Sequence, residues 1–324
     1  MNDKPLGERI SDLIIGEPKY TSVDVAAATG MTEDDAERLW IELGFTPVDS
    51  TRRQFTDADI QVLKTLRELQ ASGLVGEEVI ISMTRVLGQA LSRVAYAQAE
   101  NIDVHPSPDG SSGQVVIDDD SLSTITEVLF NGHFDQFLSY AWRRHLAEAV
   151  RQRLDNHEQD GVVGFADLVG YSTLTTQIDP VELPNLISNF EQVAYQHVSQ
   201  AGGRVLKLIG DAVMFTAPDP VSGAEAALGL RTSRMDDSQL PKVRVGLAMG
   251  ALVGIEGDLF GDTVNRASRL TGLAHPGTVL VDDTLGRALD GRDDLVVRPL
   301  RPRKLKGLGY VRTWVLRPVD TNEP

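Results

Sequence analysis

Residues 202–217 read GGRVLKLIGDAVMFTA, and this stretch decides how the second half of the chain folds. Two apolar runs flank the tripeptide Ile209-Gly210-Asp211, which is typical of two antiparallel strands joined by a tight turn. Other short apolar runs around it predict further strands, and amphipathic stretches predict helices at residues 180–200, 220–232 and 261–274. Strands that alternate with helices around a central hairpin predict an α/β sandwich of ferredoxin-like type.

The first half of the chain has a different pattern, with helices predicted at residues 32–43, 57–71 and 77–100. Residues 103–120 are rich in Pro, Gly, Ser and Asp, a composition typical of a linker, and a helical pattern returns over residues 121–154. We therefore expect an α+β protein with two domains. An all-α domain, residues 1–154, precedes the C-terminal α/β sandwich, residues 155–324.

Composition limits the possible partners and location of this chain of 324 residues, which has no cysteine and a net charge of −16. Residues 1–160 carry 14 Lys and Arg against 28 Asp and Glu, and residues 161–324 carry 17 against 19. The acidic first half should repel nucleic acid and anionic membranes. The start of the chain has no apolar region of the signal-peptide type, and no apolar run reaches the roughly 18 residues of a membrane span. We therefore expect a cytoplasmic protein.

Two aspartates of the second half are candidate metal ligands. Asp167 ends a buried strand, and Asp211 lies in the hairpin turn. Each alone is also typical of an ordinary cap or turn. Together, from neighbouring strands, they can form a cradle for two Mg²⁺ or Mn²⁺ ions of the kind that assist phosphoryl chemistry.

Four more polar residues complete a candidate site. Lys207 is flanked by apolar residues in a strand, where a lysine needs either a polar partner or access to solvent. Asn265 and Arg269 are four residues apart, so both side chains share one face of the predicted helix. Asp258 precedes them in the chain. Taken alone, Asn265 and Arg269 are also typical of an ordinary surface pair.

Three segments carry a family resemblance: GFADLVGYS at 164–172, GGRVLKLIGDAVMF at 202–215 and GDLFGDTVNRASRL at 257–270. They resemble the core motifs of class III nucleotidyl cyclases, and the resemblance covers about residues 160–318. It implies that Asp167 and Asp211 bind two metal ions and that Lys207 and Asp258 read adenine. It also implies that Asn265 orients the ribose and that Arg269 stabilises the α-phosphate in the transition state.

The implied reaction is attack of the ATP 3′-hydroxyl on the α-phosphorus, which gives cyclic AMP and pyrophosphate. In this family the metal ligands and the Asn/Arg pair come from two catalytic domains, so the resemblance implies a homodimer with active sites at the subunit interface. Guanylate cyclase is an alternative, but such enzymes usually carry glutamate and a small residue where this chain has Lys207 and Asp258. The GG[DE]EF signature of diguanylate cyclases is absent.

Residues 20–45 and 53–80 resemble the helix-turn-helix and following helices of MerR-type regulators. This makes a nucleotide-sensing transcription regulator the alternative from another functional class. The would-be recognition helix at residues 32–43 has five acidic residues and one arginine, whereas contact with phosphates needs positive charge. We therefore expect a protein-contact module and no nucleic-acid partner.

The same region also resembles the N-terminal regulatory domain of soluble actinobacterial cyclases, some of which are inhibited at neutral pH and activated by mild acid. His133, His145 and His157 lie along the last helix and the run into the second domain. Histidine is the side chain whose ordinary pKa lies between pH 5 and 8. Protonation of these histidines is a hypothesis for relief of autoinhibition, and three ordinary surface histidines are the alternative.

Overall fold

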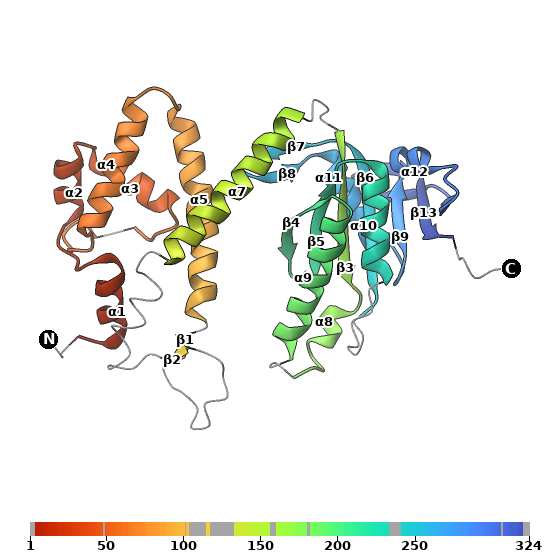
Figure 1. Cartoon of the computed structure of the whole chain (residues 1–324), viewed down its shortest axis with the longest axis horizontal. Coiled ribbons are helices and arrows are strands. Elements are labelled where there is room, and N and C mark those ends of the chain that lie inside the picture. The colour runs from red at the N-terminus through yellow and green to blue at the C-terminus, as the bar shows by residue number, and fades with distance from the viewer. Residues whose placement is uncertain are drawn as a thin grey trace. The chain divides into compact units, whose positions relative to one another are not determined.

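The computed structural model describes residues 4–47, 49–100, 102–103, 115–116, 133–155, 160–179, 182–232, 241–305 and 307–319. The chain divides into two compact units, Met1–Leu154 and Asp155–Pro324 (Figure 1). Most of the expected linker at 103–120, and the expected helical residues 121–132, lie outside the described residues. What is described there is a pair of two-residue parallel strands, β1 (Ile102–Asp103) and β2 (Val115–Val116).

The first unit is mainly helical, as the sequence predicts. Its helices are α1 (Leu6–Ile15), α2 (Ser22–Thr29), α3 (Glu33–Glu42), α4 (Asp57–Ala71), α5 (Glu77–Ala99) and α7 (His133–Asp155). Reciprocal capping boxes, Thr21 with Asp24 and Thr56 with Asp59, start α2 and α4. Apolar residues of α2, α3, α4 and the segment before α4 pack into a small core: Val25, Ala36, Leu39, Phe55, Ile60 and Leu63.

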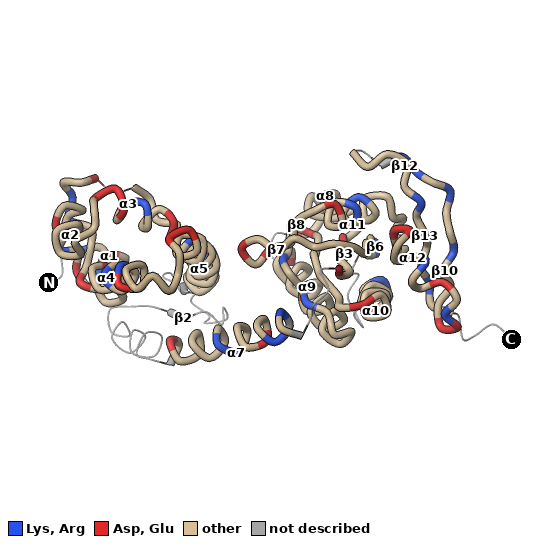
Figure 2. The backbone as a smooth tube through the Cα atoms, turned by 90° about the horizontal axis from the view of Figure 1, so that it is seen from above, with Lys and Arg blue, Asp and Glu red and all other residues tan. Residues whose placement is uncertain are grey.

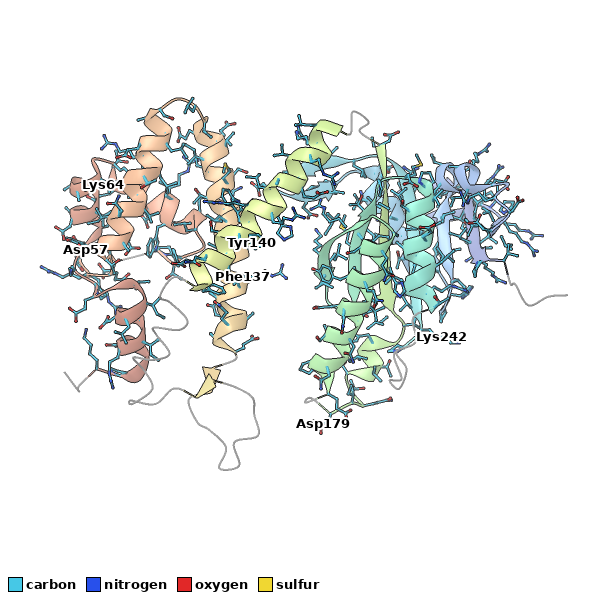
Figure 3. The ribbon with its side chains drawn as sticks, in the orientation of Figure 1. Asp57, Lys64, Phe137, Tyr140, Asp179 and Lys242 are labelled. Atoms are coloured by element: carbon cyan, nitrogen blue, oxygen red, sulfur yellow. The ribbon has the colours of Figure 1, made fainter. Side chains whose placement is uncertain are left out.

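Helix α7 has apolar side chains that remain exposed. Phe137 and Tyr140 expose 63% and 65% of their surfaces, and Figure 3 labels both on this helix. Trp142, Leu146 and Val150 follow at intervals of four residues and are also exposed, so they lie along one side of the helix. Among the described residues, no helix is long and apolar enough to cross a lipid bilayer.

The second unit is built on a seven-stranded sheet in the order β10-β13-β9-β6-β3-β5-β4. Neighbouring strands are antiparallel except for β6 and β9, which are parallel. The strands are β3 (Asp160–Leu168), β4 (Arg204–Ile209), β5 (Ala212–Ala217), β6 (Val243–Ala251), β9 (Val279–Asp282), β10 (Leu295–Pro299) and β13 (Thr313–Pro318). The predicted tight turn joins β4 to β5, and Gly210 adopts there a φ of 61°, which glycine accepts without steric cost.

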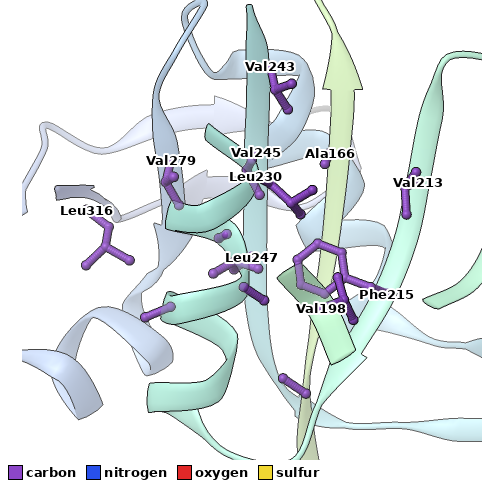
Figure 4. Close-up of a cluster of buried hydrophobic side chains, with 14 of the residues drawn as sticks. Ala166, Val198, Val213, Phe215, Leu230, Val243, Val245, Leu247, Val279 and Leu316 are labelled. Atoms are coloured by element: carbon purple, nitrogen blue, oxygen red, sulfur yellow. The ribbon is translucent and has the colours of Figure 1, made fainter. Parts of the chain in front are cut away.

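Helices cover both faces of this sheet, so the unit is the predicted α/β sandwich. Helices α9 (Leu183–Gln200), α10 (Pro220–Thr232) and α12 (Asp283–Leu289) contribute to the core on one face, where Phe215, Leu230 and Leu247 are fully buried (Figure 4). Helix α11 (Asp262–Leu273) packs on the other face against β3 and β6. The central strand β3 is buried almost throughout for this reason.

Smaller elements complete the second unit. A four-residue helix, α8 (Tyr171–Leu174), follows β3. Two short hairpins extend from the sheet: β7 (Val253–Ile255) pairs with β8 (Asp258–Phe260), and β11 (Arg303–Leu305) pairs with β12 (Gly309–Val311).

Candidate active site

Asp167 and Asp211 lie next to each other at one end of the sheet. Asp167 is near the end of β3, in register with Ala212 of β5. Asp211 directly precedes Ala212 and lies in the β4–β5 turn. The backbone N–H of Leu168 donates to the carbonyl of Asp211 at 3.1 Å. Burial raises the pKa of Asp167, the neighbouring Asp211 carboxylate adds to this rise, and Arg244 opposes it.

Arg244 is a further member of this cluster that the sequence motifs do not single out. It lies in β6, in register with Asp167, and its guanidinium Nε donates to Asp167 Oδ2 at 2.6 Å. The only sequence signal that Arg244 pairs with a carboxylate is its position inside the apolar strand KVRVGLA. Its partner could not be identified, because that depends on the register between β3 and β6.

The two carboxylates fit a divalent-cation site by their chemistry. Carboxylate oxygens are the hard ligands that Mg²⁺ and Mn²⁺ prefer, and two adjoining negative charges favour a bound cation. Among the described residues there is no group of three or more His, Cys, Asp or Glu side chains arranged to hold a metal. Mg²⁺ is usually held by one or two carboxylates together with water and substrate phosphates.

Lys207 and Asp258 form an ion pair that joins β4 to the β7–β8 hairpin. The Lys207 ammonium donates to Asp258 Oδ2, and the backbone N–H of Leu259 donates to Asp258 Oδ1 at 2.8 Å. Burial acts to raise the pKa of Asp258, but the hydrogen bonds from Lys207 and Leu259 outweigh it and lower this pKa. The polar partner expected for a lysine inside an apolar strand is therefore Asp258, and the pair presents a donor beside an acceptor.

Asp167 and Lys207 point to the sheet face that α11 covers. Phe165, two residues before Asp167, packs in the apolar cluster with α11, and alternate residues of a strand share a face. Lys207 lies in register with Met214, which belongs to the same cluster. The metal-ligand candidates and the ion pair are thus on one side of the sheet.

Asn265 and Arg269 lie on α11, and both are exposed. In the part of the chain that the structure describes, neither side chain has a hydrogen-bond or ion-pair partner. Their neighbours Ala267 and Leu270 are fully buried against the sheet, so the helix presents the amide and the guanidinium outward. The pair is free to contact a ligand or another protein chain.

The candidate pH-sensing histidines are only partly described. His133 is the first residue of α7, and His145 is exposed in the middle of that helix. His157 lies outside the described residues.

Comparisons with known proteins bear on both units. Residues 155–318 match the family model described as adenylate and guanylate cyclase catalytic domain. An adenylate cyclase of Streptomyces coelicolor is 33% identical over 97% of this chain and 90% of its own length. A pH-sensitive adenylate cyclase of Mycobacterium tuberculosis is 32% identical over 76% of this chain and 64% of its own length. The solved guanylate cyclase domain of RhGC from Catenaria anguillulae, in complex with GTP, is 22% identical with a TM-score of 0.45, over 49% of this chain and 97% of that domain.

Proposed function

The chain belongs to the adenylate and guanylate cyclase catalytic-domain family and is an adenylate cyclase, and we propose that six residues of its second unit convert ATP to cyclic AMP and pyrophosphate. The observation that carries this proposal is the placement of two charged pairs on one side of the sheet. Asp167 adjoins Asp211, and Lys207 is bonded to Asp258. The two aspartates are suited to hold metal ions that bind phosphates, and the Lys207–Asp258 pair is suited to hydrogen-bond a nucleotide base.

Asp167 and Asp211 would hold the two divalent ions. When bound, Mg²⁺ or Mn²⁺ supplies positive charge at the transferred phosphate and favours ionisation of the attacking hydroxyl. Arg244 helps to keep the Asp167 carboxylate ionised and oriented, since its guanidinium donates directly to Oδ2. Catalysis in such a site is mostly positioning and charge stabilisation.

Lys207 and Asp258 would select adenine. The adenine edge presents an acceptor at N1 and donors at N6, which complement an ammonium donor and a carboxylate acceptor. Guanine presents the opposite pattern on that edge, with an acceptor at O6 and a donor at N1. The pair therefore favours ATP over GTP.

Asn265 would hold the ribose, and Arg269 would stabilise charge on the α-phosphate. By analogy with arginine fingers, loss of Arg269 should cost about 10³-fold in rate. Both side chains are exposed and have no partner among the described residues. This supports a homodimer in which α11 of one copy completes the site on the carboxylates of the other.

The first unit would regulate this activity. Acidic residues cluster at the start of α3 (Figure 2), where Glu33, Asp34 and Asp35 occupy the first turn. Contact with protein is therefore favoured over contact with DNA. The exposed apolar side of α7 offers a further dimer contact.

The pH response would come from three histidines. Protonation of His133, His145 and His157 would relieve autoinhibition in mild acid.

An assay of product from ATP and from GTP tests the proposed activity. The full-length protein with Mn²⁺ should form cyclic AMP from ATP, and GTP should be the poorer substrate by kcat/KM. The variant Asp211→Asn should lose the activity, while Asp219→Asn, which changes an aspartate that caps the start of α10, should retain it. A preference for GTP would contradict the assignment of Lys207 and Asp258.

A further inference from the structure

A buried polar cluster lies between α11, β9 and β13, apart from the six residues assigned above. Arg266 Nε, Asp282 Oδ2 and Thr313 Oγ1 are buried and have no hydrogen-bond partner among the described residues. Arg266 Nε lies 3.5 Å from Asp282 Oδ2. Thr313 lies opposite Asp282 in the register of β13 and β9, so the two side chains share one face.

The Asp282 carboxylate has two separate tasks. Its Oδ1 accepts from the backbone N–H of Leu285 at 3.0 Å and from that of Met249 at 3.4 Å, so it caps α12. Its Oδ2 faces Arg266. Burial raises the pKa of this fully buried carboxyl, and the charge of Arg266 opposes that rise. Asparagine caps a helix as well as aspartate does, so the cap does not explain why a buried carboxyl is present.

Arg266 is positioned to fix helix α11. Its guanidinium lies between Asp282 and Asp262, with Nη2 at 3.1 Å from Asp262 Oδ2. Two threonines of the helix, Thr263 and Thr271, hydrogen-bond to backbone carbonyls of β6 and β3 at 2.9 and 3.2 Å. These two bonds hold α11 against the centre of the sheet. The ion pair of Arg266 with Asp282 adds a contact to a third strand, β9.

We propose that Arg266, held by Asp282, is a positioning residue that fixes the rotation of α11 and thereby aims Asn265 and Arg269 at the nucleotide. This inference rests on the proposed function of those two residues. Arg266 directly follows Asn265 and precedes Arg269 by three residues, so a rotation of the helix moves all three together. The outward-facing pair has no partner of its own among the described residues, and its aim depends on the buried side of the helix.

The first test compares kcat and KM for ATP between the unaltered full-length protein and its variants. We expect Arg266→Gln and Asp282→Asn to lower kcat for cyclic AMP formation by about 10- to 100-fold, because small misplacements of catalytic groups are costly. The KM for ATP should stay within about twofold, since base recognition is left intact. The matched control is Arg287→Gln, which removes an exposed arginine paired with Asp283 on α12, and its kcat should be unchanged.

A double-mutant cycle separates positioning from general destabilisation. In an Arg269→Ala background, the addition of Arg266→Gln should cost no more than about a further twofold, because residues that act as a unit are not additive. An equal loss in both backgrounds, or normal kcat in both Arg266→Gln and Asp282→Asn, would overturn the positioning role. Failure of the unaltered protein to form cyclic AMP from ATP would instead overturn the proposed function itself.

Discussion

Arg244 and Asp167 lie opposite each other in the register of β6 and β3, and the Arg244 guanidinium donates to the Asp167 carboxylate at 2.6 Å. This contact opposes the two influences that raise the pKa of Asp167, which are burial and the neighbouring Asp211 charge. A metal ligand must be deprotonated to bind its ion. In the proposed site, the arginine would therefore act on metal binding through the protonation of Asp167.

Replacement of Arg244 by glutamine should shift the pH dependence of activity. Without the guanidinium the pKa of Asp167 rises further, so the acidic limb of the pH profile of kcat/KM should move to higher pH. Half-saturation by Mn²⁺ should need more metal below neutral pH, because protons compete for the ligand. Initial rates from pH 5 to 8 measure both effects. Arg298→Gln, an exposed change on β10, is the control, and profiles that superimpose would contradict this role of Arg244.

Asp167→Asn should separate activity from stability. We expect a loss of about 10²- to 10³-fold in kcat, yet a melting temperature no more than about 2 °C below that of the unaltered protein when metal is absent. Because the folded chain raises the pKa of Asp167 above its ordinary 3.8, ionisation of this carboxyl lowers the free energy of unfolding as the pH rises from 3.8 through the raised pKa. Asparagine removes that cost. Calorimetry at pH 7 with EDTA measures the melting temperatures of both proteins. A large fall in the variant would show that Asp167 is mainly structural.

Exchange of the base-reading pair should change the preferred nucleotide. In the double variant Lys207→Glu with Asp258→Ser, the ammonium donor becomes an acceptor and the carboxylate becomes a hydroxyl. We expect kcat/KM for ATP to fall by about 10²-fold or more, because the donor and the acceptor that would pair with adenine are lost, and the ratio of GTP to ATP activity to rise. The single variants, each of which leaves one charge unpaired, should be poor with both nucleotides. An unchanged nucleotide ratio would mean that another part of the chain reads the base.

The histidine hypothesis has a simple test in the full-length protein. If protonation of His133, His145 and His157 relieves autoinhibition, cyclic AMP formation should be faster at pH 6 than at pH 8, and the triple glutamine variant should lose this difference. His275→Gln, a histidine after α11 in the second unit, is the control. Acid activation that survives the triple change would assign the pH response to other groups.

Much of the fold could be predicted because local patterns agree with it. The run GGRVLKLIGDAVMFTA predicted the β4–β5 hairpin and its turn at Gly210, which the structure confirms. Helices α4 and α10 begin and end at the predicted residues. Their starts carry clear signals, since Thr56 caps α4, and Asp219 precedes Pro220, the first residue of α10.

Other features could not be predicted, because they depend on contacts distant in sequence. Helix α12 has seven residues and begins at once after β9, where Asp282 both ends the strand and caps the helix. The β7–β8 and β11–β12 hairpins have three-residue strands, too short for a clear alternation. Arg244 and Asp282 gain their partners only from strand register and helix docking, so neither can be identified from a local motif.

The most direct test of a shared active site is a mixing experiment with two inactive variants of the full-length protein. Asp167→Ala with Asp211→Ala removes the proposed metal ligands, and Arg269→Ala removes the proposed phosphate contact. If one site takes its carboxylates from one copy and its arginine from the other, each mixed dimer has one intact site. Equal amounts, denatured and refolded together, should recover about a quarter of the unaltered rate of cyclic AMP formation from ATP with Mn²⁺. No recovery, in a mixture shown to contain mixed dimers, would contradict a site built from two copies.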